Sequence, residues 1–244
     1  MRTTWEEAGW ERLADGVARR RLPTWDATAG VVAGTTGVLL IDTGSGLREG
    51  AELRRQVRDV LGREVTHIVL THPHFDHVLG TAAFAGVTVF GPTGLGELLR
   101  REPEALAGDA VRNGADPEAT AVAVDTLVVP DHAICGERTL DLGDRRVLLA
   151  NVGPGHTAHD LAVCVRCGPG EPEIVFCGDL VEESGEPQAG PDALPACWPA
   201  ALDRLLSLGG EDARYVPGHG AVVDARFVRA QRDELARRFG VSPG

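Results

Sequence analysis

The chain has 244 residues, 43% of them hydrophobic, which suffices for one large folded domain or two small ones and excludes a disordered chain. All 24 basic residues are arginine, so a Schiff-base lysine, a Walker-type phosphate lysine and a Ser-Lys nucleophile pair are excluded. The formal net charge of -12 disfavours nucleic acid and anionic membranes as partners.

The first half of the chain alternates short apolar segments with helical patterns, as is typical of an α/β protein. Residues 47–61 place Leu53, Val57 and Leu61 on one face and predict a helix. The stretch 93–123 is expected to be helical or irregular. Strands are predicted at 29–34, 37–42, 66–71 and 87–91, and a short helix at 78–86.

The second half is richer in strands. Strands are predicted at 126–130, 145–152, 161–167, 173–178 and 213–218, and helices at 198–208 and 224–239. Asp224 is expected to cap the last helix. Because no repeat or low-complexity linker interrupts the pattern, we predict a single domain over 1–244, built from two halves of roughly 1–123 and 124–244.

Cysteine content and the N-terminal residues predict a cytoplasmic protein. Residues 1–16 contain acidic side chains and lack the apolar segment of a signal peptide, and no apolar run of about 18 residues could cross a bilayer. Five cysteines are an odd number, which favours reduced thiols. Cys164 and Cys167 lie i, i+3 in a predicted strand and would face opposite sides, so ordinary strand residues are favoured over a metal or redox pair.

Three of the eight histidines and one aspartate occur within six positions, in the sequence HPHFDH. His72 and His74 directly follow a predicted strand, and an extended backbone puts such side chains on one side, about 6–7 Å apart, as two ligands of one ion require. Pro73 keeps this stretch extended. Asp76 and His77 are adjacent at the next turn and must diverge, which suits a second ion beside the first. The pattern therefore predicts a metal site.

The motif H-x-H-x-D-H after a strand resembles the signature of the metallo-β-lactamase superfamily. This resemblance implies an α/β fold, the αβ/βα four-layer sandwich, in which two mixed sheets are flanked by helices and the site lies at one edge. Four further elements of that family occur here in the expected order, so the resemblance covers nearly the whole chain: Asp42 in LLIDTG, His156 in GPGHT, Asp179 in VFCGD and His219 in YVPGHG.

Carried onto this sequence, the resemblance implies a centre of two metal ions. The seven expected ligands fall into two groups joined by one shared residue: His72, His74 and His156 at the first position, Asp76, His77 and His219 at the second, and Asp179 between them. Asp42 would hold the ligand loop rather than bind metal. Asp-Thr-Gly is also the motif of aspartic proteases, but such a protease would need a second copy or a homodimer and would leave the histidines unexplained.

The resemblance implies an enzyme, a metal-dependent hydrolase. Two divalent ions, expected to be zinc with iron or manganese as alternatives, would lower the pKa of a bound water towards about 7 and supply a metal-bound hydroxide. That hydroxide would attack an ester, thioester, lactone or related acyl bond of a small molecule. The residues expected to take part in catalysis are Asp42, Asp76 and His219, with Asp76 steering the proton of the nucleophile.

The remaining acidic and histidine residues are expected to be bystanders. His159 matches no ligand position and is interpreted as structural, His67 lies within a predicted strand and His132 in a loop. Glu182 and Glu183 follow the Asp179 turn and are expected to form a solvated rim.

The subfamily is not assignable from the sequence. Too little chain follows His219 for the helical domain of glyoxalase-II-like enzymes, and the sole tyrosine, Tyr215, does not follow the bridging aspartate as in acyl-homoserine-lactone lactonases. A mononuclear-iron persulfide dioxygenase, a β-lactam hydrolase and a metal-stabilised scaffold remain as alternatives. The substrate is expected to contact the segments 93–123 and 182–198, with Trp198 either lining the site or packed in the core.

Overall fold

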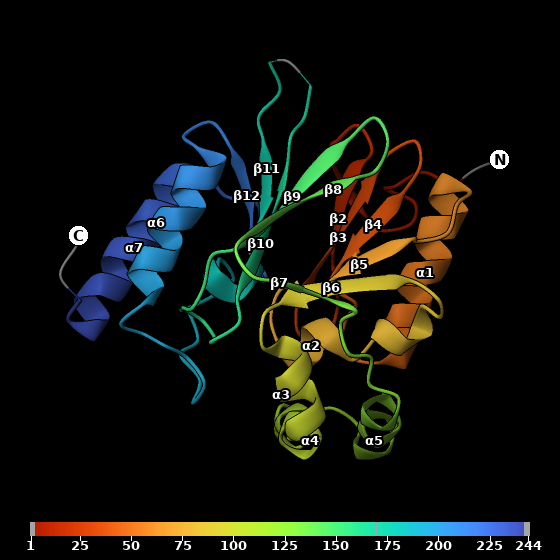
Figure 1. The fold of residues 1–244 in the computed structure, drawn as a ribbon, viewed down its shortest axis with the longest axis horizontal. Coiled ribbons are helices and arrows are strands. Elements are labelled where there is room, and N and C mark those ends of the chain that lie inside the picture. The colour runs from red at the N-terminus through yellow and green to blue at the C-terminus, as the bar shows by residue number, and fades with distance from the viewer. Residues whose placement is uncertain (1–2, 169, 242–244) are drawn as a thin grey trace.

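Two mixed β-sheets pack face to face in the computed structural model, which describes residues 3–168 and 170–241 (Figure 1). The strands of the first sheet are, in spatial order, β1 (Glu11–Ala14), β2 (Val17–Arg21), β3 (Thr28–Ala33), β4 (Val38–Ile41), β5 (His67–Val69), β6 (Thr88–Pro92) and β7 (His132–Ile134). The strands of the second sheet are β12 (Arg214–Val216), β11 (Ile174–Phe176), β10 (Leu161–Val165), β9 (Arg146–Asn151) and β8 (Glu137–Asp141). Pairing is parallel from β4 to β7 and between β11 and β12, and antiparallel elsewhere.

Helices cover the outer faces of both sheets, which gives the layered arrangement expected from the resemblance (Figure 1). On the side of the first sheet lie α1 (Leu47–Leu61), α2 (Phe75–Val78) and the 3-10 turn η1 (Thr81–Ala83), and on the side of the second sheet lie α6 (Trp198–Gly209) and α7 (Ala225–Phe239). Three further helices project beyond the sheet edge: α3 (Leu95–Arg101), α4 (Pro103–Arg112) and α5 (Pro117–Asp125). Among the described residues, no helix has both the length and the apolarity needed to cross a membrane.

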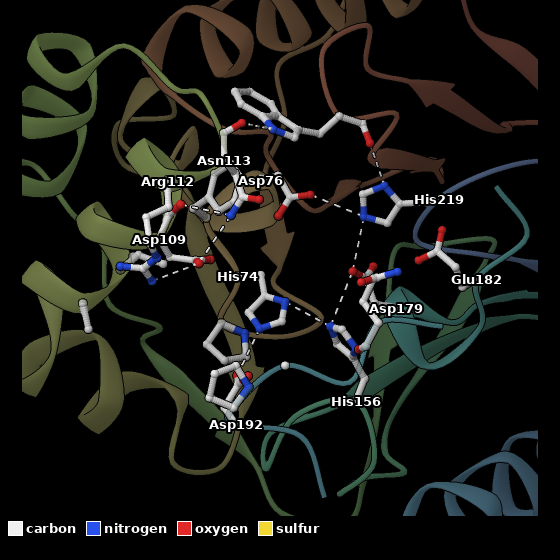
Figure 2. A pocket seen from close by; sticks show the side chains of 18 of the residues that line it. His74, Asp76, Asp109, Arg112, Asn113, His156, Asp179, Glu182, Asp192 and His219 are labelled. Atoms are coloured by element: carbon white, nitrogen blue, oxygen red, sulfur yellow. Dashed lines mark hydrogen bonds and ion pairs between the residues drawn. The ribbon is translucent and has the colours of Figure 1, made fainter. Parts of the chain in front are cut away.

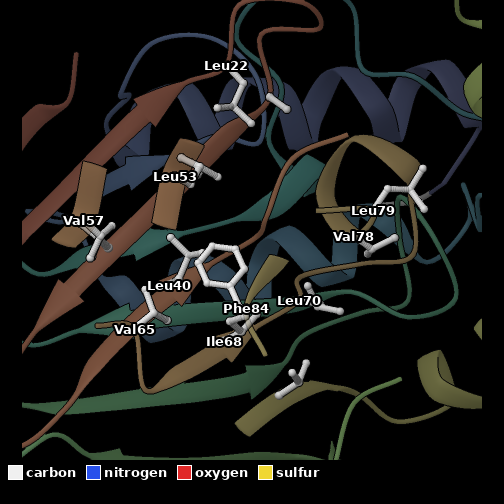
Figure 3. Close-up of a cluster of buried hydrophobic side chains, with 14 of the residues drawn as sticks. Leu22, Leu40, Leu53, Val57, Val65, Ile68, Leu70, Val78, Leu79 and Phe84 are labelled. Carbon is white, nitrogen blue, oxygen red and sulfur yellow. The ribbon is translucent and has the colours of Figure 1, made fainter. Parts of the chain in front are cut away.

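The core consists of three apolar layers because each sheet buries both of its faces. Val57 of α1 packs with Leu40 and Ile68 against the first sheet, as Figure 3 shows. Leu39 and Val163 belong to the layer between the sheets. Trp198, Leu202 and Leu205 of α6 cover the second sheet. Burying a side chain of this size stabilises the fold by about 1.5–3 kcal/mol, so the sheets form a rigid support for the residues at their edge.

The longest predicted elements are confirmed. The helix predicted at 47–61 is α1, and α7 begins after Asp224, whose carboxylate accepts a hydrogen bond from the Phe227 backbone N–H at 2.9 Å. The strand predicted at 126–130 is wrong, because this stretch is irregular and pairing starts later, in β7. Pro130 lacks the N–H that a paired strand donates, which explains the delay.

Three strands were not anticipated from the sequence. β1, β2 and β8 are rich in arginine and glutamate, and β8 is exposed or half-buried along its length as the last strand of its sheet. β1 and β8 are edge strands, which carry charged side chains and lack the apolar alternation that identifies a strand, and β2, although inside the sheet, has arginine at three of its five positions. The chain passes from the first sheet to the second between Ile134 and Glu137. The description of residues 1–244 as one domain with two halves stays a prediction.

Candidate metal centre

Five segments that are far apart in the sequence bring polar side chains to one edge of the sheets (Figure 2). Most of them follow the carboxyl end of a strand, which is where open α/β sheets place their ligand sites. The contributions, in chain order, are Asp42 after β4, His72 and His74 after β5, Asp76 and His77 within α2, His156 between β9 and β10, Asp179 in the 3-10 turn η2 (Gly178–Leu180) and His219 after β12.

The first group has the four members expected for the first metal position. One donor atom from each of them lies within 4.8 Å of the others: His72, His74, His156 and Asp179. His74 Nδ1 and His156 Nε2 are 3.0 Å apart, and both His72 Nε2 and His156 Nε2 lie 3.5 Å from Asp179 Oδ2. The group is enclosed, since only His74 is more than slightly exposed.

The second group adjoins the first and shares the Asp179 carboxylate. Donor atoms of Asp76, His77 and His219 again lie within 4.8 Å of one another. Asp76 Oδ2 is 3.3 Å from His219 Nε2 and 3.6 Å from His77 Nε2. Asp179 presents Oδ1 to His77 Nε2 at 3.3 Å and Oδ2 to His219 Nε2 at 3.2 Å. We refer to these seven residues of the two groups together as the metal cluster.

Each histidine of the metal cluster directs one ring nitrogen inward and the other to an acceptor on the scaffold. The acceptors for the outer nitrogens are Thr71 Oγ1 for His72, Asp192 Oδ2 for His74, Asp42 Oδ2 for His77, the Gln188 carbonyl for His156 and the Trp25 carbonyl for His219, at 2.8–3.1 Å. Such partners fix the tautomer and the ring orientation of histidines that bind metal. Five rings held in this way turn five inner nitrogens toward one space.

Three buried atoms in that space support the fit to metal ions. The described residues offer no hydrogen-bond partner to His72 Nε2, His77 Nε2 or Asp179 Oδ1. Leaving a buried polar atom without a partner costs about 1–3 kcal/mol, so a fold tolerates three in contact only where something else binds them. Imidazole nitrogens and carboxylate oxygens are the ligands of divalent transition metals, and the residues present therefore fit such ions.

Burial and neighbouring charges set the protonation of the metal cluster. Burial lowers the pKa of His72 to about 4 and that of His156 to about 3, so both rings are neutral at pH 7, as metal binding requires. Burial acts to raise the pKa of Asp179, but the charges of His77, His72 and His219 outweigh it and hold this pKa well below its ordinary value. Asp179 is therefore ionised, as a carboxylate shared by two cations would have to be.

Asp42 supports the metal cluster from beneath. Its carboxylate accepts hydrogen bonds from the Thr71 backbone N–H at 2.8 Å, from Thr71 Oγ1 at 2.7 Å and from His77 Nδ1 at 2.8 Å. Its backbone has a φ of 56°, in the left-handed region that aspartate tolerates better than most residues. The one carboxylate thus joins β4 to the ligand loop, and no contact places it among the ligands.

A glycine allows the last histidine to approach the shared carboxylate. A Cβ atom at Gly218 would lie 1.8 Å from Asp179 Oδ1, closer than any real contact. The Gly218 backbone also donates to the Gly178 carbonyl at 2.8 Å, which ties the turn after β12 to the turn after β11. The Gly-His pair in YVPGHG therefore brings His219 beside Asp179 because no side chain separates the two turns.

A cavity of about 680 Å³ opens onto the metal cluster, and its walls come from the two expected segments. The helical wall, residues 95–125, contributes the side chains of Leu98, Leu106 and Asp109, among others. The loop wall, residues 182–198, contributes Glu182 and Asp192. Both segments thus contact the space where a substrate would lie.

Trp198 does not line this cavity. Its side chain is fully buried, its Nε1 donates to the Leu180 carbonyl at 3.0 Å, and its ring packs 5.4 Å from the ring of His156. It therefore supports His156 from the core.

The sequence-based interpretation of Glu182 is wrong, because this residue is 8% exposed and lines the cavity instead of forming a solvated rim. A short β-bridge pairs it with His219, and burial raises its pKa to about 7. Glu183, in contrast, points away and accepts a hydrogen bond from the Ala221 backbone N–H at 2.6 Å. Only the fold distinguishes these two neighbours, since nothing in the sequence indicates which of them turns inward.

The histidines expected to be bystanders lie outside the metal cluster. His159 Nδ1 contacts the Thr93 carbonyl at 2.8 Å, which links the His156 loop to the turn just before the helical wall. His132 belongs to β7, not to a loop, and stacks on Phe90, while His67 begins β5. The contacts that the sequence did not reveal are those of Asp192, Gln188 and Trp25 with cluster histidines, because each joins residues more than thirty positions apart.

Fold and cluster together define the class as a metal-dependent hydrolase, and the comparisons agree. The family model described as the metallo-beta-lactamase superfamily matches residues 22–219. The chain therefore belongs to the metallo-β-lactamase superfamily, and the resemblance based on H-x-H-x-D-H is confirmed, with its subfamily unassigned.

Solved structures show the same fold at low sequence identity. The metallo-β-lactamase FIM-1 from Pseudomonas aeruginosa, in its mono-zinc form, superposes with a TM-score of 0.70 at 21% identity over 96% of both chains. A metallo-β-lactamase from Pontibacter korlensis gives 0.68 at 24% identity over 92% of this chain and 98% of that chain. The metallo-β-lactamase DIM-1 superposes with a TM-score of 0.71 at 18% identity, over 94% of this chain and 97% of that chain. The predicted α/β sandwich is thereby confirmed.

Proposed function

We propose that the protein is a dinuclear metal-dependent hydrolase, with zinc as the expected metal, that cleaves an ester, thioester, lactone or related acyl bond of a small molecule. The observation that carries the proposal is the arrangement of five histidines, each with its outer nitrogen on a scaffold acceptor and its inner nitrogen facing Asp76 or Asp179. A site that only stabilised the fold would need four ligands, whereas seven converge here, at the base of an open cavity.

The residues of the metal cluster would divide the work between the two positions. His72, His74 and His156 would hold the first ion and Asp76, His77 and His219 the second, with Asp179 shared. Such ions, when bound, supply a Lewis acid and a water of lowered pKa. Asp76 Oδ2 faces the cavity as well as His219, so it is placed to take up and steer a proton from the nucleophile.

The charges around the cavity favour a substrate without a free carboxylate. Among the described residues that line it, Arg112 is the one arginine, and its guanidinium is already paired with Asp109 at 3.2 Å. Three carboxylates also lie on the rim, those of Asp192, of Glu102, which pairs with Arg101, and of Glu186, which pairs with Arg238, so no unpaired arginine faces the cavity among these residues. Since a β-lactam carries a carboxylate, this rim argues against a β-lactam as substrate, and neutral or cationic acyl compounds fit it better.

The apolar part of the cavity is suited to a hydrocarbon or aromatic group. Trp25 and Phe75 pack edge to face with ring centroids 5.2 Å apart, and Leu98, Leu99 and Leu106 continue this surface.

A cytoplasmic location is part of the proposal, supported by five cysteines that form no disulfide in the structure.

Elemental analysis of the purified protein, combined with a panel of neutral, cationic and anionic esters, thioesters and lactones, tests the proposal. We expect two divalent ions per chain, turnover of neutral or cationic acyl compounds, and loss of turnover on chelation that zinc restores. One iron per chain, with oxygen uptake on glutathione persulfide, would instead establish the dioxygenase alternative. Metal-replete protein without turnover of any compound would contradict the hydrolase.

A further inference from the structure

Glu182 is held beside the second metal position by contacts from two directions. Its backbone N–H donates to Gln231 Oε1 at 3.0 Å, and Gln231 Nε2 donates to the Leu180 carbonyl at 2.8 Å, so α7 fixes the segment from the core side. The β-bridge with His219 fixes it from the other side. Figure 2 shows Glu182 next to Asp179 and His219. A residue positioned in this way cannot turn out to solvent without breaking buried contacts.

The side chain of Glu182 completes a third group of donor atoms. A carboxylate oxygen of Glu182, one of Asp179 and a ring nitrogen of His219 lie within 4.8 Å of one another. Atoms that share one ion through bonds of roughly 2.0–2.2 Å lie about 3–4.5 Å apart, so these three are close to the spacing that an ion needs. Ser184 Oγ donates to Glu182 Oε1 at 2.6 Å, which orients the carboxylate and leaves Oε2 for another partner.

The two metal positions therefore differ in their chemistry. Three imidazoles and the Asp179 carboxylate surround the first. On the side of the second, Asp76 and His77 form one group with His219, and Glu182 forms another with His219 and Asp179, so three carboxylates and two imidazoles gather there. Imidazole suits zinc, whereas carboxylates suit harder ions such as manganese.

We propose that Glu182 is a further ligand of the second metal position and makes the preference for Mn²⁺ relative to Zn²⁺ greater there than at the first. The inference rests on the proposed two-metal centre, because without a second ion Glu182 has nothing to bind. An extra carboxylate also adds negative charge to a position where Asp76 and Asp179 already face a cation, so its removal should weaken binding of that ion and spare the other.

The test compares the metal-free forms of the wild type, Glu182→Gln and Glu183→Gln, each titrated with Mn²⁺ and with Zn²⁺. Electron paramagnetic resonance measures bound manganese, and competition with a chromogenic chelator measures zinc. We expect Glu182→Gln to bind the second Mn²⁺ at least about tenfold more weakly, with a smaller loss for Zn²⁺ and an unchanged first ion. Glu183→Gln is the matched control, since its side chain faces Ala221 and not the metal cluster, and it should behave as the wild type.

The outcomes separate this inference from the proposed function. If the wild type binds two ions and Glu182→Gln binds the second Mn²⁺ equally well, Glu182 is no ligand and the inference fails alone. If the wild type never binds a second ion, the proposed two-metal centre fails first. Thermal unfolding of the metal-free proteins checks that Glu182→Gln folds. Should it not fold, Glu182→Asp retains the charge on a shorter side chain, and unchanged Mn²⁺ affinity in that variant would overturn the assignment.

Discussion

The metal cluster and the walls of the cavity are built from different kinds of structure. The cluster lies on strand ends and tight turns, and six of its seven residues are nearly inaccessible to solvent or only slightly exposed. The helical wall projects beyond the sheets, and its helices α4 and α5 bury few side chains, with Val111 and Val122 exposed. Contacts to the core therefore fix the cluster, while side chains in the walls can be substituted without disturbing it.

This contrast separates metal binding from substrate selection. The outer partners of the cluster histidines are mostly backbone carbonyls or buried groups such as Asp42, rather than side chains that face the cavity. The walls contribute apolar and acidic side chains that face the cavity. Substitutions in the cluster should therefore change metal content, and substitutions in the walls should change which compound is turned over.

The largest effect is expected at the residue that both metal positions share. Asp179→Ala should lower the metal content to one ion or fewer per chain and reduce turnover by about a thousandfold or more, because it removes the carboxylate that both metal positions would share. Inductively coupled plasma mass spectrometry and activity with added zinc measure both. A variant that retains two ions per chain would refute the shared role of Asp179.

Residues near one another in the sequence account for much of what could be predicted. HPHFDH follows a strand and enters a helix, so its spacing alone predicted which side chains meet. Asp42 also follows a strand directly, and Asp179 comes three residues after the end of one. Strand ends are readable from sequence because buried strands are short, apolar and bounded by turns.

Long-range contacts account for what could not be predicted. The pairing of His74 with Asp192 spans 118 positions, and that of His219 with Trp25 spans 194. Glu182 and Glu183 have the same chemistry, and only the bridge with His219 turns the first one inward. The charged strands β2 and β8 gave no apolar pattern. Each of these features depends on which segments the fold brings together, and none leaves a local signal.

A smaller effect is expected at Asp42, which holds the ligand loop from beneath. Asp42→Asn retains the size of the side chain and its tolerance of a positive φ, but its amide has one acceptor oxygen instead of two and cannot accept from the Thr71 N–H, Thr71 Oγ1 and His77 Nδ1 together. Loss of such an outer partner should lower the affinity for the second ion by about 10–100-fold and the affinity for the first ion by less. Stepwise removal of zinc with a chelator measures the two affinities. Equal weakening of both ions would show that Asp42 supports the whole loop and not His77 in particular.

A substitution in the helical wall should change substrate turnover and leave the metal content unchanged. Leu106→Ala removes apolar surface from the cavity without touching the metal cluster, so kcat/KM should fall by about tenfold for compounds with a large apolar group, at unchanged metal content. Val111→Ala is the matched control, since Val111 is on the same helix, α4, and is 39% exposed outside the cavity. A loss of metal in Leu106→Ala would contradict the separation of walls from cluster.

The smallest effect is expected where the two regions meet, at Asp192. This loop-wall residue accepts from His74 Nε2 at 3.0 Å, as Asp42 accepts from His77, but its side chain is 46% exposed whereas that of Asp42 is 4% exposed. Water screens an exposed carboxylate and can replace it as the acceptor. Asp192→Asn should therefore lower the affinity for the first ion by only about threefold to tenfold. Glu186→Gln in the same loop, whose partner is the outward Arg238, should leave zinc affinity unchanged. If Asp192→Asn instead cost as much as Asp42→Asn, the loop wall would be part of the metal site, and the walls could not vary independently of the cluster.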